Sequence, residues 1–151
     1  GPQVMAGYWH NREATDAVID AGGWFHTGDI GQADQDGYVY VVDRLKDMVI
    51  TGGENVYPAE VEAVLYHHPA IAEVAVLGTP HGQWGEAVTA VVALNPGAAL
   101  TLEELSAFAR DQLAGYKIPL RLEFVDALPR NPAGKVLKYQ LLEQLTTAPE
   151  G

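Results

Sequence analysis

Residues 43–62 constrain the fold of this chain more than any other stretch of similar length. They begin with a charged run at 43–47 and continue into residues 48–51, whose apolar and β-branched side chains predict a short strand. Gly52 and Gly53 then predict a turn, and Pro58 opens a helix at the position where its missing N–H costs nothing. This order predicts a domain boundary within residues 43–47 and a compact domain after it.

The rest of the chain alternates between strand-like and helix-like segments. The patterns predict helices at 13–20, 58–68 and 102–113 and from 137 onward. They also predict a hairpin at 30–42, with its turn at Asp36-Gly37, and strands at 71–78, 87–94 and 122–125. Residues 79–86 are expected to form a loop. Thr101 and Glu104 have the spacing of a capping box. The order predicts an α+β fold in which helices cover a small mixed sheet, preceded by a β-hairpin.

Composition excludes several classes of function. A chain of 151 residues with 48% hydrophobic residues can bury a core, and its net charge of −11 argues against nucleic acid and anionic membrane surfaces. It has no cysteine, no apolar run that could span a bilayer, and no metal-binding pattern among its five histidines. We therefore expect a cytoplasmic protein without a metal site of its own. Its Ala- and Gly-rich, Lys-poor composition suggests a bacterial source.

Three separated motifs carry the functional signal: Thr27-Gly28-Asp29, residues 43–62 and residues 129–135. Neither glycine-containing loop is a Walker-type phosphate loop, because Gly53 is not followed by Lys-Ser/Thr and Val136 stands where that motif needs Ser or Thr. In this order the motifs resemble the C-terminal portion of an acyl-CoA synthetase, an AMP-forming acyl- or aryl-CoA ligase of the adenylate-forming ANL superfamily. The resemblance covers nearly the whole chain.

The resemblance implies a particular domain organisation. Residues 1–43 would be the C-terminal tail of a large ATP- and acyl-binding domain, residues 44–47 a hinge, residues 48–146 a mobile C-terminal domain and residues 147–151 a flexible tail. The chain starts without Met, either through a processed tag or because it comes from within a longer protein; the resemblance at the first residues favours the latter. A missing N-terminal domain would then be its main partner, and the isolated chain is expected to be inactive.

The resemblance also assigns residues to ATP. Asp29 corresponds to a carboxylate that accepts hydrogen bonds from the ribose hydroxyls, and Arg44 to a residue at the ribose or phosphates. Tyr40 would lie near the adenine. From the residues alone, Asp29 can also be interpreted as a carboxylate that caps a turn.

Two lysines have distinct expected roles. Lys46 matches the family's hinge position, where backbone rotation exchanges an adenylating and a thioester-forming pose; the alternative is a solvated charge cluster. Lys135, in a loop shaped by two prolines and a glycine, matches the catalytic lysine that reaches the acyl carboxylate and the α-phosphate.

The remaining assignments concern CoA. Gly52 and Gly53 would form part of the wall of the pantetheine tunnel, although they also fit a tight turn. Trp84, Tyr116 and Lys117 would contact the CoA nucleotide. Ile118 departs from the family pattern, since some relatives place a phosphate-binding Arg there, and Trp84 could simply cap the domain edge.

The implied reaction joins a fatty or aryl acid to CoA, with ATP converted to AMP and pyrophosphate. ATP, CoA and a carboxylic acid are the expected small-molecule partners, and magnesium is expected with ATP but not at a site in this chain. Two alternatives remain: an adenylation domain that loads the pantetheine of a carrier protein, and a non-catalytic interaction module.

Overall fold

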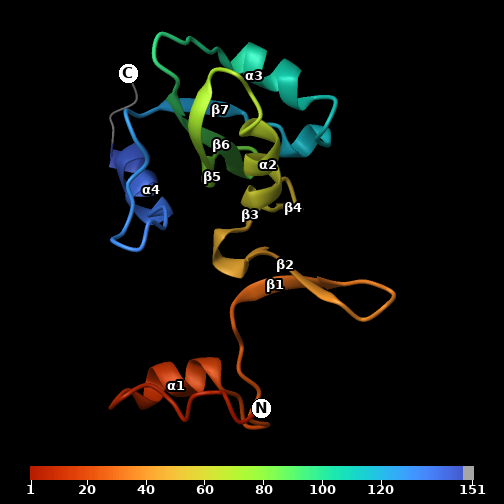
Figure 1. Cartoon of the computed structure of the whole chain (residues 1–151), viewed down its shortest axis with the longest axis vertical. Coiled ribbons are helices and arrows are strands. Elements are labelled where there is room, and N and C mark those ends of the chain that lie inside the picture. Colours follow the sequence, from red (N-terminus) through yellow and green to blue (C-terminus); the bar gives the residue numbers. More distant parts are fainter. Residues whose placement is uncertain (148–151) are drawn as a thin grey trace. The chain divides into compact units, whose positions relative to one another are not determined.

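The computed structural model describes residues 1–147, which form two compact units along the chain (Figure 1). The first unit is Gly1–Lys46 and the second begins at Asp47. The division falls inside the charged run at 43–47, within a short 3-10 turn, Leu45–Asp47. Of the predicted flexible tail, Thr147 is the last residue of a helix, and residues 148–151 lie outside the described part of the chain.

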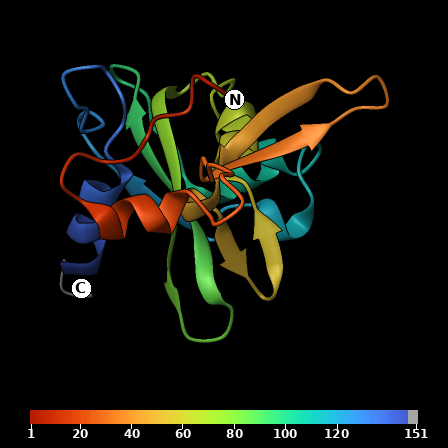
Figure 2. The same ribbon diagram turned by 90° about the horizontal axis from the view of Figure 1, so that it is seen from below.

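The second unit is built on a five-stranded mixed sheet. Its strands are β3 (Val49–Thr51), β4 (Glu54–Val56), β5 (Ile71–His81), β6 (Gly85–Leu94) and β7 (Arg121–Phe124). The order is β4-β3-β6-β5, with β7 as a parallel neighbour of β6 and the other pairs antiparallel. Figure 2 shows the turn of the β5–β6 hairpin, in green, next to the shorter β3–β4 hairpin in yellow-brown.

Three helices cover the two faces of this sheet: α2 (Pro58–Leu65), α3 (Leu102–Ala109) and α4 (Lys138–Thr147). Alternate strand residues point to opposite faces, so neighbours in one strand belong to different cores. Val76 of β5 packs in a cluster with Val61 of α2 and Leu105 of α3, whereas Leu77 packs with Leu141 of α4. The sheet is therefore enclosed between α2 and α3 on one face and α4 on the other, which confirms the predicted α+β fold.

Local sequence signals explain where two of the helices begin. Pro58 occupies the first turn of α2, as predicted. At α3 both bonds of the capping box are present: the Glu104 N–H donates to Thr101 Oγ1 at 3.2 Å, and the Thr101 N–H donates to Glu104 Oε2 at 2.8 Å. The Thr101 hydroxyl also donates to Glu104 Oε2, at 2.9 Å. This bond is the main cause that lowers the pKa of Glu104, and the Thr101 N–H contributes.

The prediction of a loop at 79–86 was wrong for most of its length. β5 continues to His81 and β6 begins at Gly85, so only residues 82–84 form the turn. Thr79 is buried, its hydroxyl 2.7 Å from that of Thr89 on β6. Pro80 is tolerated because β5 is the outer strand of the sheet.

Two further predictions needed correction. β4 was missed, because its three residues follow Gly53 too closely to show an alternating pattern. The helix predicted at 102–113 ends at Ala109, yet Leu113 beyond it is still buried in the core beside Leu105. Helical spacing identified the core residues better than the end of the helix.

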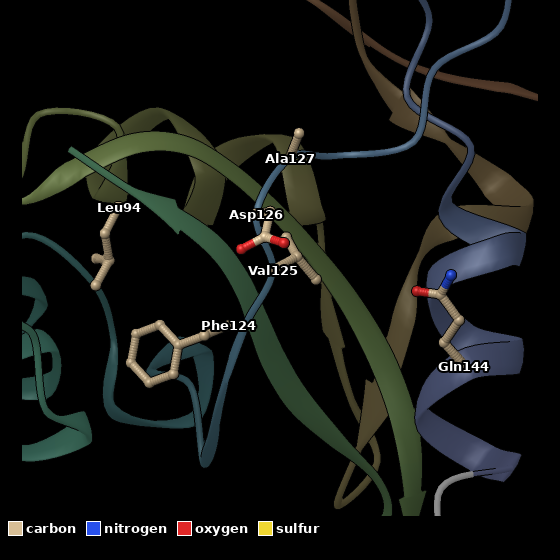
Figure 3. Close-up of a pocket in the computed structure, with 6 residues that line it drawn as sticks. All are labelled: Leu94, Phe124, Val125, Asp126, Ala127 and Gln144. Atoms are coloured by element: carbon tan, nitrogen blue, oxygen red, sulfur yellow. The ribbon is translucent and has the colours of Figure 1, made fainter. Parts of the chain in front are cut away.

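An open groove of about 730 Å³ lies where the parallel strands β6 and β7 end (Figure 3). It is lined by Leu94, Phe124, Val125, Asp126, Ala127 and Gln144. Among these described lining residues only Asp126 is charged, and its charge is negative. The lining therefore contains no cation that would attract a phosphate group. None of the predicted site residues lies in it.

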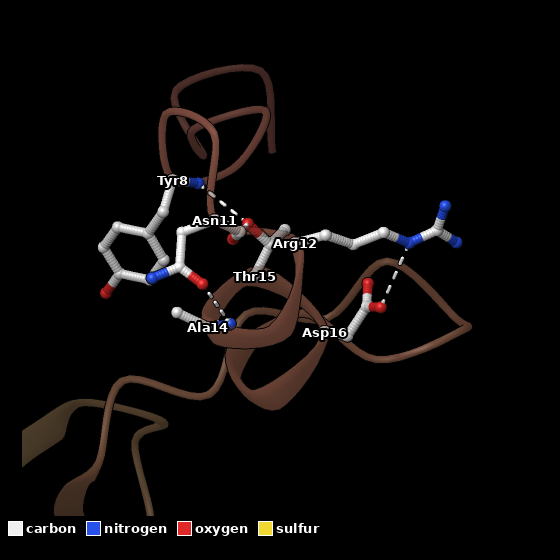
Figure 4. A network of polar contacts seen from close by, with 6 residues as sticks. All are labelled: Tyr8, Asn11, Arg12, Ala14, Thr15 and Asp16. Atoms are coloured by element: carbon white, nitrogen blue, oxygen red, sulfur yellow. Dashed lines mark hydrogen bonds and ion pairs between the residues drawn. The ribbon is translucent and has the colours of Figure 1, made fainter.

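The first unit contains α1 (Arg12–Val18) and a hairpin of β1 (Asp29–Ala33) and β2 (Val39–Arg44). Asn11 caps α1 by accepting the Ala14 N–H at 3.0 Å, and the Tyr8 N–H donates to Thr15 Oγ1 at 2.9 Å (Figure 4). No hydrophobic side chain of residues 1–46, all of which are described, is buried. This unit is held by local hydrogen bonds and has no core of its own.

Candidate functional site

Asp29 and Arg44 face each other at the open end of the first unit's hairpin. They are paired residues of β1 and β2, and Arg44 Nε lies 2.9 Å from Asp29 Oδ1. The Arg44 guanidinium also donates through Nη1 to the carbonyl of Thr27, at 3.1 Å. Gly28 has a φ of +72°, which favours glycine between these partners. The structure thus brings two predicted ATP-binding residues together as a half-exposed ion pair.

Tyr40 lies away from this pair. It is opposite Gln32, nearer the turn of the hairpin, and its hydroxyl donates to Asp34 Oδ2 at 3.0 Å. The backbone N–H of Tyr38 is the main cause that lowers the pKa of Asp34, and the Tyr40 hydroxyl adds to it. The structure therefore gives Tyr40 a turn-stabilising contact and does not join it to Asp29 and Arg44.

The loop that carries Lys135 has a closely hydrogen-bonded backbone. The Asn131 side-chain oxygen accepts the N–H groups of Ala133 and Lys135, at 3.0 and 2.9 Å. The Asn131 N–H donates to the Lys135 carbonyl at 2.9 Å, and Gly134 has a φ of +83°. This loop presents Lys135 from a fixed backbone.

Arg130 anchors the same loop to the sheet. Its Nη1 donates to the carbonyl of Gly134 at 2.8 Å, and its Nη2 lies 2.5 Å from Glu73 Oε1 on β5. Glu73 also accepts the Leu128 N–H at 3.1 Å. Arg130 is the main cause that holds the pKa of Glu73 below its usual range, and Leu128 contributes.

The four lysines of the chain fall into two classes. Lys117 pairs with Glu60 and Lys138 with Glu62, each at 2.6 Å. Within residues 1–147, the ammonium groups of Lys46 and Lys135 have neither a hydrogen bond nor an ion pair, and both side chains are exposed. The two lysines with predicted functional roles are therefore the two whose charge is not neutralised within the fold.

Gly52 and Gly53 form the turn between β3 and β4, and the structure places Trp84 against the first of them. The Gly52 N–H donates to the Trp84 carbonyl at 2.9 Å, and a Cβ added to Gly52 would lie 2.9 Å from Trp84 Cε3. Gly53 has open space where a Cβ would point, and both glycines have positive φ, +59° and +87°. The double glycine is both a tight turn and a site of close ring–backbone contact.

Tyr116 and Lys117 lie on a 3-10 turn, Gly115–Lys117, that contacts β4. Lys117 Nζ is bonded to both carboxylate oxygens of Glu60, and this bond is the main cause that raises the pKa of Lys117. The Lys117 Nζ also lies 5.7 Å from the centre of the Tyr116 ring. Ile118 packs against the core, which explains an apolar residue at that position.

Sequence reasoning missed four charged residues that position the predicted ones: Glu60, Glu73, Glu86 and Arg130. Each acts on a partner at least 36 positions away, apart from the Arg130 bond to Gly134. Glu60 and Arg130 lie within two of the three motifs, residues 43–62 and 129–135, but these motifs do not reveal their partners. No pattern in the sequence pairs these residues.

Residues 1–147 contain neither a metal-binding cluster nor a membrane-spanning helix. No group of three or more His, Asp or Glu residues there is arranged to hold a metal ion. No helix in that part of the chain is both long and apolar enough to cross a bilayer.

Comparison with known proteins identifies the family of this chain. The profile of the AMP-binding enzyme C-terminal domain matches residues 60–135. A feruloyl-CoA synthase from Amycolatopsis is 53% identical over 141 residues, 93% of this chain and 28% of that protein. A fatty acid–[acyl-carrier-protein] ligase, ScoC from Streptomyces coeruleorubidus, is 46% identical over 95% of this chain and 27% of its own length.

A solved structure shows the same fold. ATP-bound MatB from Rhodopseudomonas palustris superposes with a TM-score of 0.90 at 44% identity, covering 97% of this chain and 29% of that one. The chain thus spans a little over a quarter of the length of the curated relatives it matches. The resemblance inferred from the three motifs is confirmed: the chain belongs to the AMP-binding enzyme C-terminal domain family, and its homologues are acyl- and aryl-acid ligases.

Proposed function

We propose that this chain acts as the C-terminal part of an AMP-forming acyl-CoA ligase. In the first half-reaction a carboxylate oxygen of the acid attacks the α-phosphorus of ATP, forming an acyl-adenylate and releasing pyrophosphate. In the second, the sulfur of a deprotonated thiol attacks the acyl carbon, forming a thioester and releasing AMP. A large N-terminal domain of the same polypeptide would hold the acid and most of ATP.

The observation that carries this proposal is the free ammonium of Lys135 on a fixed loop. A cation without a partner in its own fold is available to an anionic ligand, and a held backbone limits the cost of positioning it. Lys135 would contact the acyl carboxylate and the α-phosphate, where negative charge develops during adenylation. Asp29 and Arg44 would bind the ribose side of the nucleotide, with Tyr40 assigned near the adenine.

The second half-reaction would use a different face of the second unit. Lys46 lies in the turn where the two units divide. Backbone rotation there would remove the Lys135 loop from the active site and bring in the Gly52–Gly53 turn. The absence of side chains at both glycines leaves room for a pantetheine arm beside Trp84. Tyr116 and Lys117 would then lie toward the CoA nucleotide.

The acceptor is CoA in this proposal, and a carrier-protein pantetheine is the second candidate. The similarity to ScoC supports the second candidate, as does the Glu60 carboxylate that already occupies Lys117.

The acid is proposed only as a class, fatty or aryl. Magnesium is expected to arrive with ATP, and the cytoplasm is the proposed location.

The test uses the full-length parent polypeptide and a panel of fatty, aryl and dicarboxylic acids. Pyrophosphate and AMP release are measured with CoA, with a carrier protein and without acceptor. Lys135→Ala is expected to slow adenylation on the order of 100- to 1,000-fold while preformed acyl-adenylate is still converted to thioester. Arg110→Ala is the matched control, because Arg110 is an exposed cation with no side-chain bond in the described residues.

The outcomes separate the candidates. AMP release that requires CoA supports the ligase, and release that requires the carrier protein supports the second candidate. If no acid supports pyrophosphate release, or if Lys135→Ala behaves like Arg110→Ala, a non-catalytic interaction module is the better description. The 151-residue chain alone is expected to release no pyrophosphate.

A further inference from the structure

The β3–β4 hairpin, which carries Gly52 and Gly53, has little backbone pairing with the rest of the sheet. β3 pairs with β4 over three residue pairs, but with β6 only through Thr51 and Gly85. β3 begins two residues after the boundary between the two units. Whatever holds β3 against β6 therefore fixes the position of the double glycine.

Glu86 supplies a bond where the ladder between these strands would otherwise stop. Its Oε2 accepts the Ile50 N–H at 2.7 Å. Together with the Thr51–Gly85 pair and the bond from Gly52 N–H to the Trp84 carbonyl, this makes an antiparallel series in which 50, 51 and 52 meet 86, 85 and 84. A carboxylate side chain replaces a backbone carbonyl in the series, and charged acceptors make stronger hydrogen bonds than neutral ones.

Gly78 of β5 makes room for this carboxylate. A Cβ at position 78 would lie 2.7 Å from Glu86 Oε1, 2.9 Å from Glu86 Cδ and 3.1 Å from Val49 Cγ1. Gly78 is not among the glycines with positive φ, so its backbone does not require glycine. The space above Gly78 is what the Glu86 carboxyl group needs to reach β3.

We infer that Glu86 is a positioning residue for thioester formation, which holds the Gly52–Gly53 turn in place through Ile50 and is itself accommodated by Gly78. This inference rests on the proposed function. In the proposed reaction Glu86 does not contact a substrate. Its role is specific to the second half-reaction, because adenylation uses the Lys135 loop, which is anchored separately through Arg130 and Glu73.

The test compares two substitutions that break the same contact from opposite sides. In the full-length parent, Glu86→Ala removes the acceptor and Gly78→Ala displaces it. Each is expected to slow conversion of preformed acyl-adenylate to thioester by about 10- to 100-fold, with pyrophosphate release unchanged. Glu86→Gln keeps an oxygen acceptor and is expected to recover most of the rate.

Matched controls are available for both changes. Glu123 is an exposed carboxylate on β7 with no side-chain bond in the described residues, and an added Cβ at Gly82 meets open space. Glu123→Ala and Gly82→Ala should leave both half-reactions unchanged. Hydrogen exchange of the Ile50 amide reports the contact directly and should accelerate in Glu86→Ala and Gly78→Ala only.

Each result decides the matter. Faster Ile50 exchange with an unchanged thioester rate would overturn the positioning role. An equal loss of both half-reactions would also overturn it, by showing general destabilisation. If the wild-type parent forms no acyl-adenylate at all, the proposed function fails, whereas a wild-type ligase with an unaffected Glu86→Ala variant contradicts this inference alone.

Discussion

Arg130 bonds to Glu73 across 57 positions of sequence, with Arg130 Nη2 2.5 Å from Glu73 Oε1. The other end of the same guanidinium holds the carbonyl of Gly134, the residue before Lys135. One ion pair therefore connects the edge strand β5 to the loop that presents the proposed catalytic lysine. Its energetic contribution is expected to be greater than that of an isolated surface pair, because Glu73 also accepts the Leu128 N–H.

Glu73→Gln should weaken adenylation without removing any group that contacts substrate. The neutral amide still accepts a hydrogen bond, but it loses the charge that orients Arg130, so the Lys135 loop becomes less fixed. We expect pyrophosphate release to fall by about 10-fold, with thioester formation from preformed acyl-adenylate unchanged. Glu123→Gln is the control, and equal losses in both half-reactions would show that Glu73 acts on stability alone.

Acid should remove the contribution of Glu73 to stability. In the folded chain its pKa is held below the ordinary value of 4.5. At a pH between that lowered pKa and 4.5, the unfolded chain therefore binds a proton that the folded chain does not. The contribution is fully present above about pH 4.5 and is lost as the pH falls through the lowered pKa of Glu73. Urea unfolding of wild type and Glu73→Gln should therefore differ at pH 7 and converge as the pH falls through the lowered pKa of Glu73; a difference that stays constant with pH would contradict this pairing.

Gly52 and Gly53 offer a matched pair of substitutions. Both have positive φ, so Ala at either position should lower the free energy of unfolding by about 1–2 kcal/mol. Only Ala at 52 would also meet the Trp84 ring. In a background of Trp9→Phe and Trp24→Phe, Trp84 emission should shift in Gly52→Ala and stay unchanged in Gly53→Ala. Identical spectra would show that the ring does not lie against Gly52 in solution.

Removal of the Glu60 charge should free Lys117 for the acceptor. The bond from Glu60 raises the pKa of Lys117 and occupies its ammonium, so Glu60→Gln leaves a cation beside Tyr116 without its charged partner. If CoA is the acceptor, its KM should fall several-fold in Glu60→Gln and rise in Lys117→Ala, with pyrophosphate release unaffected. A KM for CoA that is insensitive to both changes would remove Lys117 from the CoA site.

Some of the fold could be read from local chemistry. Pro58 at the start of α2 and the Thr101–Glu104 capping box act within one helical turn, so the sequence alone was sufficient to place them. The strands predicted at 71–78 and 87–94 were too short, because Pro80 is acceptable in a strand only when that strand is at an edge. Edge position is a property of the sheet and not of the segment.

The same distinction applies to the candidate site. The family, the α+β class and the motifs that contain Asp29, Arg44, Gly52 and Lys135 could all be identified from the sequence, because they depend on residue types at fixed short spacings. Tertiary packing determines which charges are neutralised: Lys117 pairs with Glu60, and Arg130 pairs with Glu73. The same packing brings the Glu86 carboxylate to the Ile50 N–H as a hydrogen-bond acceptor. Those contacts join residues 36 to 57 positions apart, and the packing of helices and strands that creates them leaves no periodic signal in the chain.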